Sequence, residues 1–80
     1  DAAMLAKSRT DDLEEALAGL APRDAKVLRL YFGLDDGTSH TLEEIGRMMG
    51  VTRERIRQLR DRALRQLREE YGDKLRDLAA

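Results

Sequence analysis

Apolar residues recur along this chain every three or four positions, which is the spacing of one face of an α-helix. No segment alternates with a period of two, and β-branched residues are sparse, so the pattern predicts no strand. Glycine, proline and threonine residues divide the periodic pattern into separate helices. We expect a compact all-α domain of four to five helices, which span about residues 11–18, 22–32, 42–49 and 53–70, with a last short turn after Gly72.

Local signals mark where the middle helices begin and end. Pro22 fits the first turn of the second helix, because an N–H at that position would have no partner within the helix. Gly33 is suited to a left-handed stop. Thr41 and Glu44 have the spacing of a capping box at the start of the third helix. The residues expected to form the apolar stripe of the second helix are Val27, Leu28, Tyr31 and Phe32.

The segment LEEIGRMMGVTRERIRQLRD, residues 42–61, contains the residue types that a helix-turn-helix requires. Gly46 is expected where two steeply crossing helices come closest, Gly50 supplies the turn, and Val51 fills the corner. The apolar residues expected to join the two helices are Ile45, Met49, Ile56 and Leu59. A helical hairpin without a role in DNA binding is the alternative.

The formal net charge is only −1, but the charges are unevenly distributed along the chain. Residues 47–68 hold eight arginines against Glu54 and Asp61, whereas residues 1–46 and residues 69–80 are both acidic on balance. The electrostatic field depends on where charges lie and not on their sum. A solvated helix face with i,i+4 ion pairs is the alternative, but it would have roughly equal signs. Residues 47–68 are therefore predicted to bind a polyanion.

The fourth helix turns a mixed set of polar groups outward if its apolar residues face the core. Glu54, Gln58 and Asp61 lie on this outward face, with Arg57 beside them. A carboxylate gains nothing near a phosphate, but it can accept a hydrogen bond from the amino group of cytosine in the major groove, as Arg suits guanine and Gln suits adenine. Glu54 is therefore a candidate base reader; alternatively, it only favours the positive end of its own helix.

The starts of the third and fourth helices are candidate phosphate sites, because helix N-termini present backbone N–H groups. Thr41 and Leu42 begin the third helix, and Thr52 begins the fourth. A role for Thr52 as a plain N-cap is compatible with phosphate binding. Met48 is interpreted as a packing residue, with an exposed contact for a protein partner as the alternative.

These residues are similar to a known family. TLEEIGRMMGVTRERIRQLRDRALRQLR resembles region four of the primary (housekeeping) sigma factors of bacterial RNA polymerase, and LAGLAPRDAKVLRLYFGLDDG resembles the first half of that region. The resemblance implies a domain that reads the promoter −35 hexamer in the major groove and docks on the flap of the polymerase β subunit. It implies that the residues facing base edges are Arg53, Glu54, Arg57 and Gln58. The phosphate contacts that it implies are Arg23, Thr41, Leu42, Thr52 and Arg55.

The resemblance also suggests a division of the chain and shows two departures. Residues 1–10 are interpreted as a leader or short helix, 11–70 as the region 4 domain with its helix-turn-helix at 42–61, and 71–80 as a C-terminal tail or short helix. Tyr31 stands where many relatives carry an Arg that touches the DNA backbone, and the tail REEYGDKLRDLAA is acidic and lacks proline. The apolar concavity for the flap is expected around the end of the long helix and Leu20, Val27, Leu28 and Leu30.

Other functional classes find no support in the sequence. The chain has no cysteine for a disulfide, no apolar run that could cross a bilayer and no signal-peptide pattern. His40 has no ligand partners, and no nucleophile–base pair is recognisable. We expect no enzyme activity, cofactor, metal or membrane partner, and a monomeric, cytoplasmic piece of a longer protein.

Expected partners are promoter DNA, the RNA polymerase core through its β flap, and regulators of the anti-sigma, activator or phage type. Two alternatives stay open. A helix-turn-helix regulator output domain would dimerise, and a protein-interaction module would use its arginines to bind a sigma-directed regulator.

Overall fold

Residues 9–79 of the chain form four α-helices in the computed structural model, and side chains are described for residues 12–72. There is no strand in this range, so the predicted all-α class is confirmed. Most of the expected leader, residues 1–8, lies outside the described residues. The helices are α2 (Arg9–Ala18), α3 (Pro22–Phe32), α4 (Leu42–Met49) and α5 (Arg53–Ala79).

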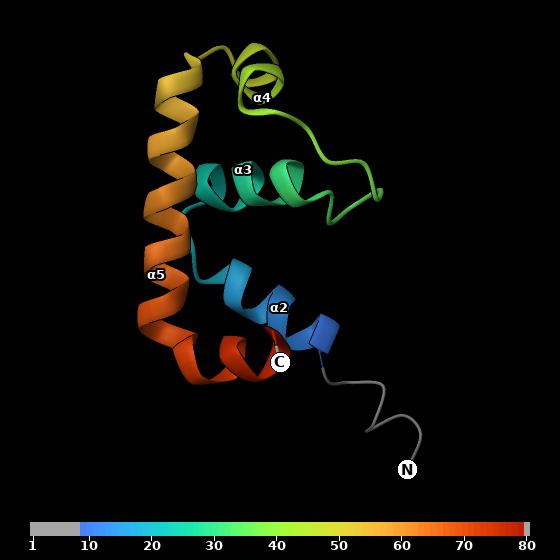
Figure 1. Cartoon of the computed structure of the whole chain (residues 1–80), viewed down its shortest axis with the longest axis vertical. Helices are drawn as coiled ribbons and strands as arrows, with labels where there is room; N and C mark the ends of the chain where they lie inside the picture. The colour runs from blue at the N-terminus through green and yellow to red at the C-terminus, as the bar shows by residue number, and fades with distance from the viewer. Residues whose placement is uncertain (1–8, 80) are drawn as a thin grey trace.

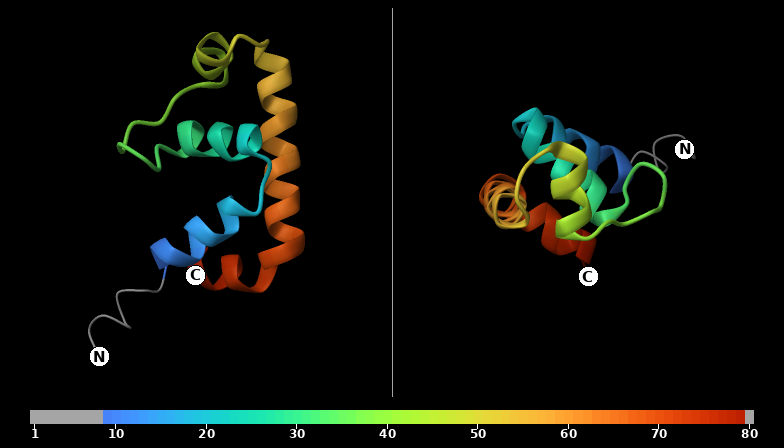
Figure 2. Two further views of the ribbon diagram at one scale, coloured as in Figure 1. Left: turned by 180° about the vertical axis from the view of Figure 1, so that it is seen from behind. Right: turned by 90° about the horizontal axis from the view of Figure 1, so that it is seen from above.

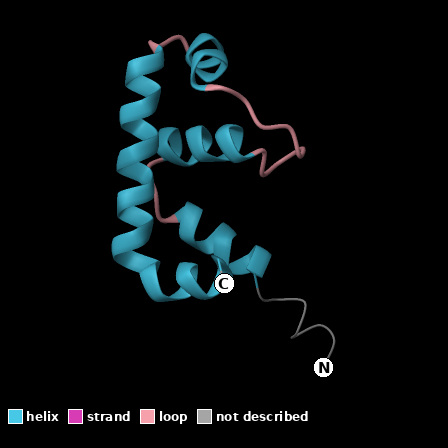
Figure 3. Cartoon of the chain, viewed as in Figure 1, coloured by secondary structure: helices cyan, strands magenta, loops and turns pink. Residues whose placement is uncertain are grey.

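The long helix α5 forms one side of the molecule, and the three shorter helices pack along it (Figure 1). α4 lies at the start of α5, α3 crosses its middle, and α2 approaches its lower part (Figure 1). The views from behind and from above show all three on the same side of α5 (Figure 2). A long loop joins α3 to α4, and the other connections are short (Figure 3). One face of α5 is therefore left uncovered by the other helices.

Helix ends follow the local signals in the sequence. Thr41 and Glu44 form the predicted capping box, and Gly33 and Gly50 both adopt left-handed conformations with φ of 64° and 73°. The break predicted at Gly72 occurs one residue earlier, because Tyr71 has non-helical φ and ψ of −130° and 22° within α5. The predicted bounds of α3 and α4 are confirmed, and α2 begins two residues earlier than expected.

Among the described side chains, the core consists of two clusters that α5 connects. The first joins α2, α3 and the second half of α5 through Ala16, Leu17, Leu20, Leu28, Ala63 and Leu67. The second joins α3, α4 and the first half of α5 through Val27, Ile45, Ile56 and Leu59. Because α5 contributes to both clusters, the orientation of its outward face is fixed from Ile56 to Leu67.

Several apolar positions differ from the sequence-based expectation. Leu20, Val27 and Leu28 are at most 6% exposed and belong to the core, so they do not line an open concavity for a partner helix. Conversely, Phe32 and Met48 are exposed, so their assignment to packing is wrong, and the exposed position of Met48 fits the alternative given for it. Exposed apolar surface therefore lies at the ends of α3 and α4.

A buried carboxylate fixes α3 against α5. Asp24, in the first turn of α3, is 1% exposed and is the one buried charged residue among the described side chains. Arg62 of α5 donates two hydrogen bonds to it, at 2.8 Å to Oδ1 and 3.1 Å to Oδ2. Such charge-assisted, two-point pairs set the relative position of the two elements as well as contributing energy.

Asp24→Asn should lower the free energy of unfolding by about 2 kcal/mol, since it removes the charge from two hydrogen bonds and turns an amide donor toward a guanidinium. Urea denaturation measures this change. Glu15→Gln, on the exposed surface of α2, removes one negative charge without touching the core and should leave stability unchanged. Equal effects of the two substitutions would contradict a specific role of the Asp24–Arg62 pair.

Candidate nucleic-acid interface

The helix-turn-helix predicted at residues 42–61 is present in the structure. α4 ends at Met49. The N–H of the following Gly50 donates to the carbonyl of Gly46, and Val51 N–H donates to the same carbonyl at 2.9 Å. Gly46 is buried and lies against the turn, because an added Cβ would lie 2.7 Å from the carbonyl oxygen of Val51. α5 begins immediately after this turn, at the top of the molecule in Figure 1.

The four predicted base-reading residues, Arg53, Glu54, Arg57 and Gln58, occupy the first two turns of α5. Arg53, Glu54 and Gln58 are exposed, and the side chain of Arg57 is 43% exposed. The intervening Ile56 is fully buried. The structure therefore groups all four residues on the solvent side of one helix, next to the turn.

Ion pairs already link the charged groups on this face in the absence of a ligand. Arg57 donates to Glu54 through Nε and NH2 and to Asp61 through NH1 at 2.8 Å. Arg60 donates to the other oxygen of Asp61 at 3.0 Å. We call this set the α5 ion-pair network; it consists of Glu54, Arg57, Arg60 and Asp61. Its formal charges sum to zero.

Hydrogen bonds within the network shift the pKa values of Glu54 and Arg57. Hydrogen bonding from Arg57 lowers the pKa of the Glu54 carboxyl below its ordinary value, and the hydrogen bond to Glu54 raises the pKa of Arg57. Glu54 is therefore a carboxylate near neutral pH and can only accept hydrogen bonds. An acceptor at this position is suited to a donor such as the cytosine amino group.

The two threonines assigned to phosphate binding are both N-caps. Thr41 Oγ1 accepts from Glu44 N–H at 3.1 Å, while Glu44 accepts from Thr41 N–H at 2.8 Å. Thr52 Oγ1 accepts from Arg55 N–H at 3.0 Å. A hydroxyl that accepts one hydrogen bond keeps its own O–H for donation. Helix capping and phosphate binding are therefore compatible at both positions.

The remaining predicted phosphate residues lie on different elements. Leu42, the first residue of α4, is half-buried against the second core cluster. Arg55 is exposed on α5, and its NH1 donates to Oε1 of Gln58 at 3.3 Å. Arg23 is exposed in the first turn of α3 beside Asp24, whose partner Arg62 lies farther along α5 than the reading residues. The structure thus distributes these residues over the starts of three helices.

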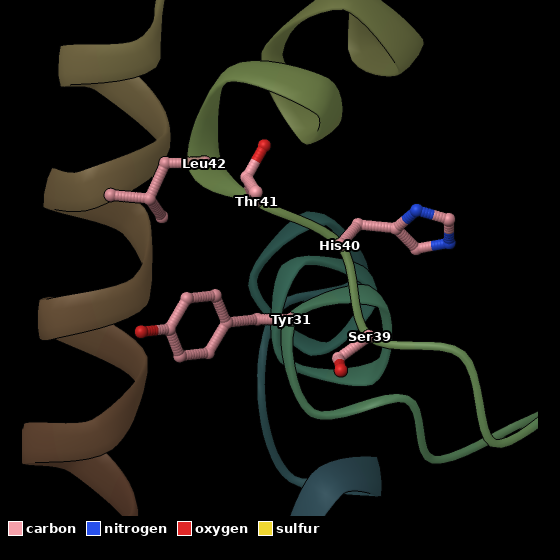
Figure 4. Close-up of a pocket in the computed structure, with 5 residues that line it drawn as sticks. All are labelled: Tyr31, Ser39, His40, Thr41 and Leu42. Atoms are coloured by element: carbon pink, nitrogen blue, oxygen red, sulfur yellow. The ribbon is translucent and has the colours of Figure 1, made fainter.

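A shallow pocket lies next to the start of α4. It is lined by the end of α3 and the loop that follows, through Tyr31, Ser39, His40, Thr41 and Leu42. Figure 4 shows the Tyr31 ring and Leu42 pointing toward α5, whereas the His40 imidazole points away from them. His40 N–H donates to the Leu30 carbonyl at 2.9 Å, which fixes the loop against α3.

The contact that Tyr31 makes with Arg60 could not be predicted from the sequence. Its hydroxyl accepts a hydrogen bond from Arg60 NH1 at 3.2 Å, and the Arg60 guanidinium lies 5.1 Å from the ring centroid. This cation–π contact joins residues that are far apart in sequence, so no local pattern could reveal it.

Within the part of the chain that the structure describes, no three His, Cys, Asp or Glu side chains gather into a possible metal site. Over the same residues, no helix combines the length and apolar character needed to cross a membrane.

The chain is similar to known proteins over most of its length. Residues 16–69 match the family described as Sigma-70, region 4. The chain is 54% identical over 77 residues to RNA polymerase sigma factor RpoD of Neisseria gonorrhoeae, which covers 95% of this chain and 12% of that protein. It is 60% identical over 58 residues to RNA polymerase sigma factor SigA of Listeria monocytogenes serovar 1/2a, covering 72% of this chain and 16% of that protein. The chain therefore spans less than a fifth of the length of either relative.

Proposed function

The chain belongs to the sigma-70 region 4 family, and from this premise we propose that it is a noncatalytic domain that recognises the promoter −35 element during transcription initiation. The observation that carries the proposal is the exposed start of α5, where Glu54 lies among arginines next to the helix-turn-helix turn. In such a motif the first residues of the second helix enter the major groove and contact base edges.

The chemistry of the reading residues supports this role. Arg53 and Arg57 each offer two donors that match the acceptors of guanine, and Gln58 can pair with adenine through one donor and one acceptor. Glu54 offers only acceptors, which match the exposed amino group of cytosine. A helix that bound phosphates alone would gain nothing from this carboxylate.

Phosphate contacts would orient the helix on the duplex without reading sequence. The N-terminus of α4 at Thr41 and Leu42 and that of α5 at Thr52 present N–H groups and a positive dipole end. Arg55 and Arg23 add exposed positive charges. These five residues remain our proposed phosphate contacts.

We also propose that the domain docks on the flap of the polymerase β subunit. Phe32 is 50% exposed and Met48 is 55% exposed, and they are the exposed large apolar residues among the described side chains. An amphipathic partner helix could bury such residues. They replace Leu20, Val27 and Leu28 as the expected contacts.

A single small module neutralises few phosphates, so its own affinity for DNA should be modest and strongly dependent on salt. Tethering to the polymerase would replace intrinsic affinity by effective concentration. The acidic residues outside α5 would further limit binding to random DNA.

Arg55→Ala tests the proposed function by removing one of the proposed phosphate contacts. The variant should weaken binding to a duplex with a −35 hexamer and to a duplex with the permuted hexamer by the same factor. It should also reduce the slope of log K against log salt by about one. Fluorescence anisotropy of the 80-residue chain at several salt concentrations measures both quantities.

Lys26→Ala is the matched control, because it removes an exposed positive charge from α3 outside the proposed interface. We expect it to change neither duplex affinity appreciably. Wild-type protein that bound both duplexes equally well would refute −35 recognition. An Arg55→Ala variant that changed the preference between duplexes would refute only its assignment to phosphate.

A further inference from the structure

Asp61 is the carboxylate at the centre of the α5 ion-pair network. It lies on the outward face of α5, one turn beyond Arg57, and its side chain is 39% exposed. Its two oxygens have different partners: Oδ2 accepts from Arg57 and Oδ1 accepts from Arg60. One carboxylate therefore engages two cations that would otherwise be available to a polyanion.

Each of these two arginines is also held from a second side. Arg60 donates NH1 to the Tyr31 hydroxyl, and its guanidinium lies over the Tyr31 ring. Arg57 gives NH1 to Asp61 and directs its Nε–NH2 edge to Glu54. The Nε–NH2 edge is thus the part of Arg57 that can be exchanged while the contact to Asp61 is kept.

A duplex that carries the −35 hexamer, here called the matched duplex, can accept this exchange without breaking the contact between Arg57 and Asp61. Guanine offers N7 and O6 to the Nε–NH2 edge of Arg57, and cytosine offers its amino group to the released Glu54 carboxylate. Both partners of the Arg57–Glu54 pair then find a replacement, while NH1 of Arg57 stays on Asp61.

Non-specific DNA offers a different exchange. Binding to it depends on cations that reach phosphates and release counterions. Arg60 would have to leave Asp61 to reach a phosphate. If the Nε–NH2 edge of Arg57 bound a phosphate, Glu54 would lose its partner, and its carboxylate would then repel the backbone. This cost falls on the non-specific complex and is absent from the matched complex.

We propose that Asp61 is a specificity-determining residue that holds Arg57 and Arg60 away from phosphates and aims the Nε–NH2 edge of Arg57 at bases. The inference rests on the proposed −35 recognition. It assigns to Asp61 a positioning role, because Asp61 acts on DNA through the two arginines.

Asp61→Asn tests the proposal in the 80-residue chain. Affinity for the permuted duplex should rise about three- to tenfold at low salt, and the slope of log K against log salt on that duplex should steepen by about one to two, since up to two arginines become free to bind phosphates. Affinity for the matched duplex should rise less, so the ratio of the two affinities should fall. Anisotropy titrations over a salt series measure these values.

Three further variants separate this role from simpler effects. Asp61→Glu keeps an i,i+4 carboxylate and should retain the wild-type ratio. Glu15→Gln changes the net charge equally on the far helix α2, so it should leave the ratio and both slopes unchanged. Adding Arg60→Gln to Asp61→Asn should make the slope of log K against log salt less steep by about one than in Asp61→Asn alone, because one freed cation is removed.

The outcomes distinguish the inference from the proposed function. If wild-type protein prefers the matched duplex and Asp61→Asn keeps the same ratio and salt slope, the role of Asp61 is refuted and −35 recognition stands. If wild-type protein shows no preference, −35 recognition fails and the inference fails with it.

Discussion

Gly46→Ala is expected to lower the free energy of unfolding by about 2 kcal/mol, although alanine is the better helix former. A Cβ at this position would lie 2.7 Å from the carbonyl oxygen of Val51 and 3.4 Å from Arg53 N. Both atoms belong to the backbone of the turn and the start of α5, so no side-chain rotation can relieve the overlap. Such overpacking costs about 3 kcal/mol at the upper end, and the gain in helix propensity of about 1 kcal/mol offsets only part of it.

Gly72→Ala is the matched control for this substitution. Gly72 also lies within a helix, but a Cβ added there meets nothing within 4 Å. This variant should be as stable as the wild type or slightly more stable, because only the propensity term remains. Urea denaturation of both variants decides the matter. If Gly46→Ala were as stable as Gly72→Ala, the turn backbone would have to move at no cost to accommodate the added Cβ. The steric explanation for Gly46 would then be wrong.

Helix boundaries could be predicted because their signals are local. Pro22 and Gly33 delimit α3, and Thr41 and Gly50 delimit α4, and in both cases the structure begins and ends the helix at the expected residues. Each of these signals acts through backbone groups within a few residues, so the rest of the fold is not needed to interpret it. The capping box of Thr41 and Glu44 is the clearest example.

Contacts between distant residues could not be predicted in this way. The pairs Asp24–Arg62 and Tyr31–Arg60 join α3 to α5, and each depends on how the two helices cross. Periodicity assigned Phe32 to a buried stripe, yet Phe32 lies at the end of α3 that points away from α5 (Figure 1) and is half exposed. An amphipathic pattern indicates which face of a helix is buried, but it does not indicate how far the neighbouring helices cover it.

The same limit applies to the candidate interface. Charge distribution predicted a polyanion-binding helix, and the sequence placed its reading residues on one face. It did not reveal that Asp61 and Tyr31 together hold Arg60. The number of arginines therefore overstates the positive charge available for phosphates, because several guanidiniums are already paired with carboxylates of the same chain. A helix with fewer available cations depends more on base contacts for its affinity.

Glu54→Ala should accordingly produce two effects of opposite sign. On the matched −35 duplex, affinity should fall about tenfold to a hundredfold, because one base pair loses its hydrogen-bond acceptor. On permuted duplexes, affinity should rise slightly, since Arg57 loses one of its two carboxylate partners and becomes freer to bind phosphate. The preference for one base pair would then be lost, while the other positions of the hexamer keep theirs.

Anisotropy titrations of wild type and Glu54→Ala against duplexes that carry every single substitution in the hexamer would identify that base pair. Glu54→Gln is the informative companion, because its amide both donates and accepts and should shift the preference toward adenine at the same position. Stability measurements on both variants should show no loss of folding, since Glu54 is exposed and pairs with Arg57 of the same helix. A Glu54→Ala variant that weakened every duplex equally would show that this carboxylate supports the helix and does not read a base.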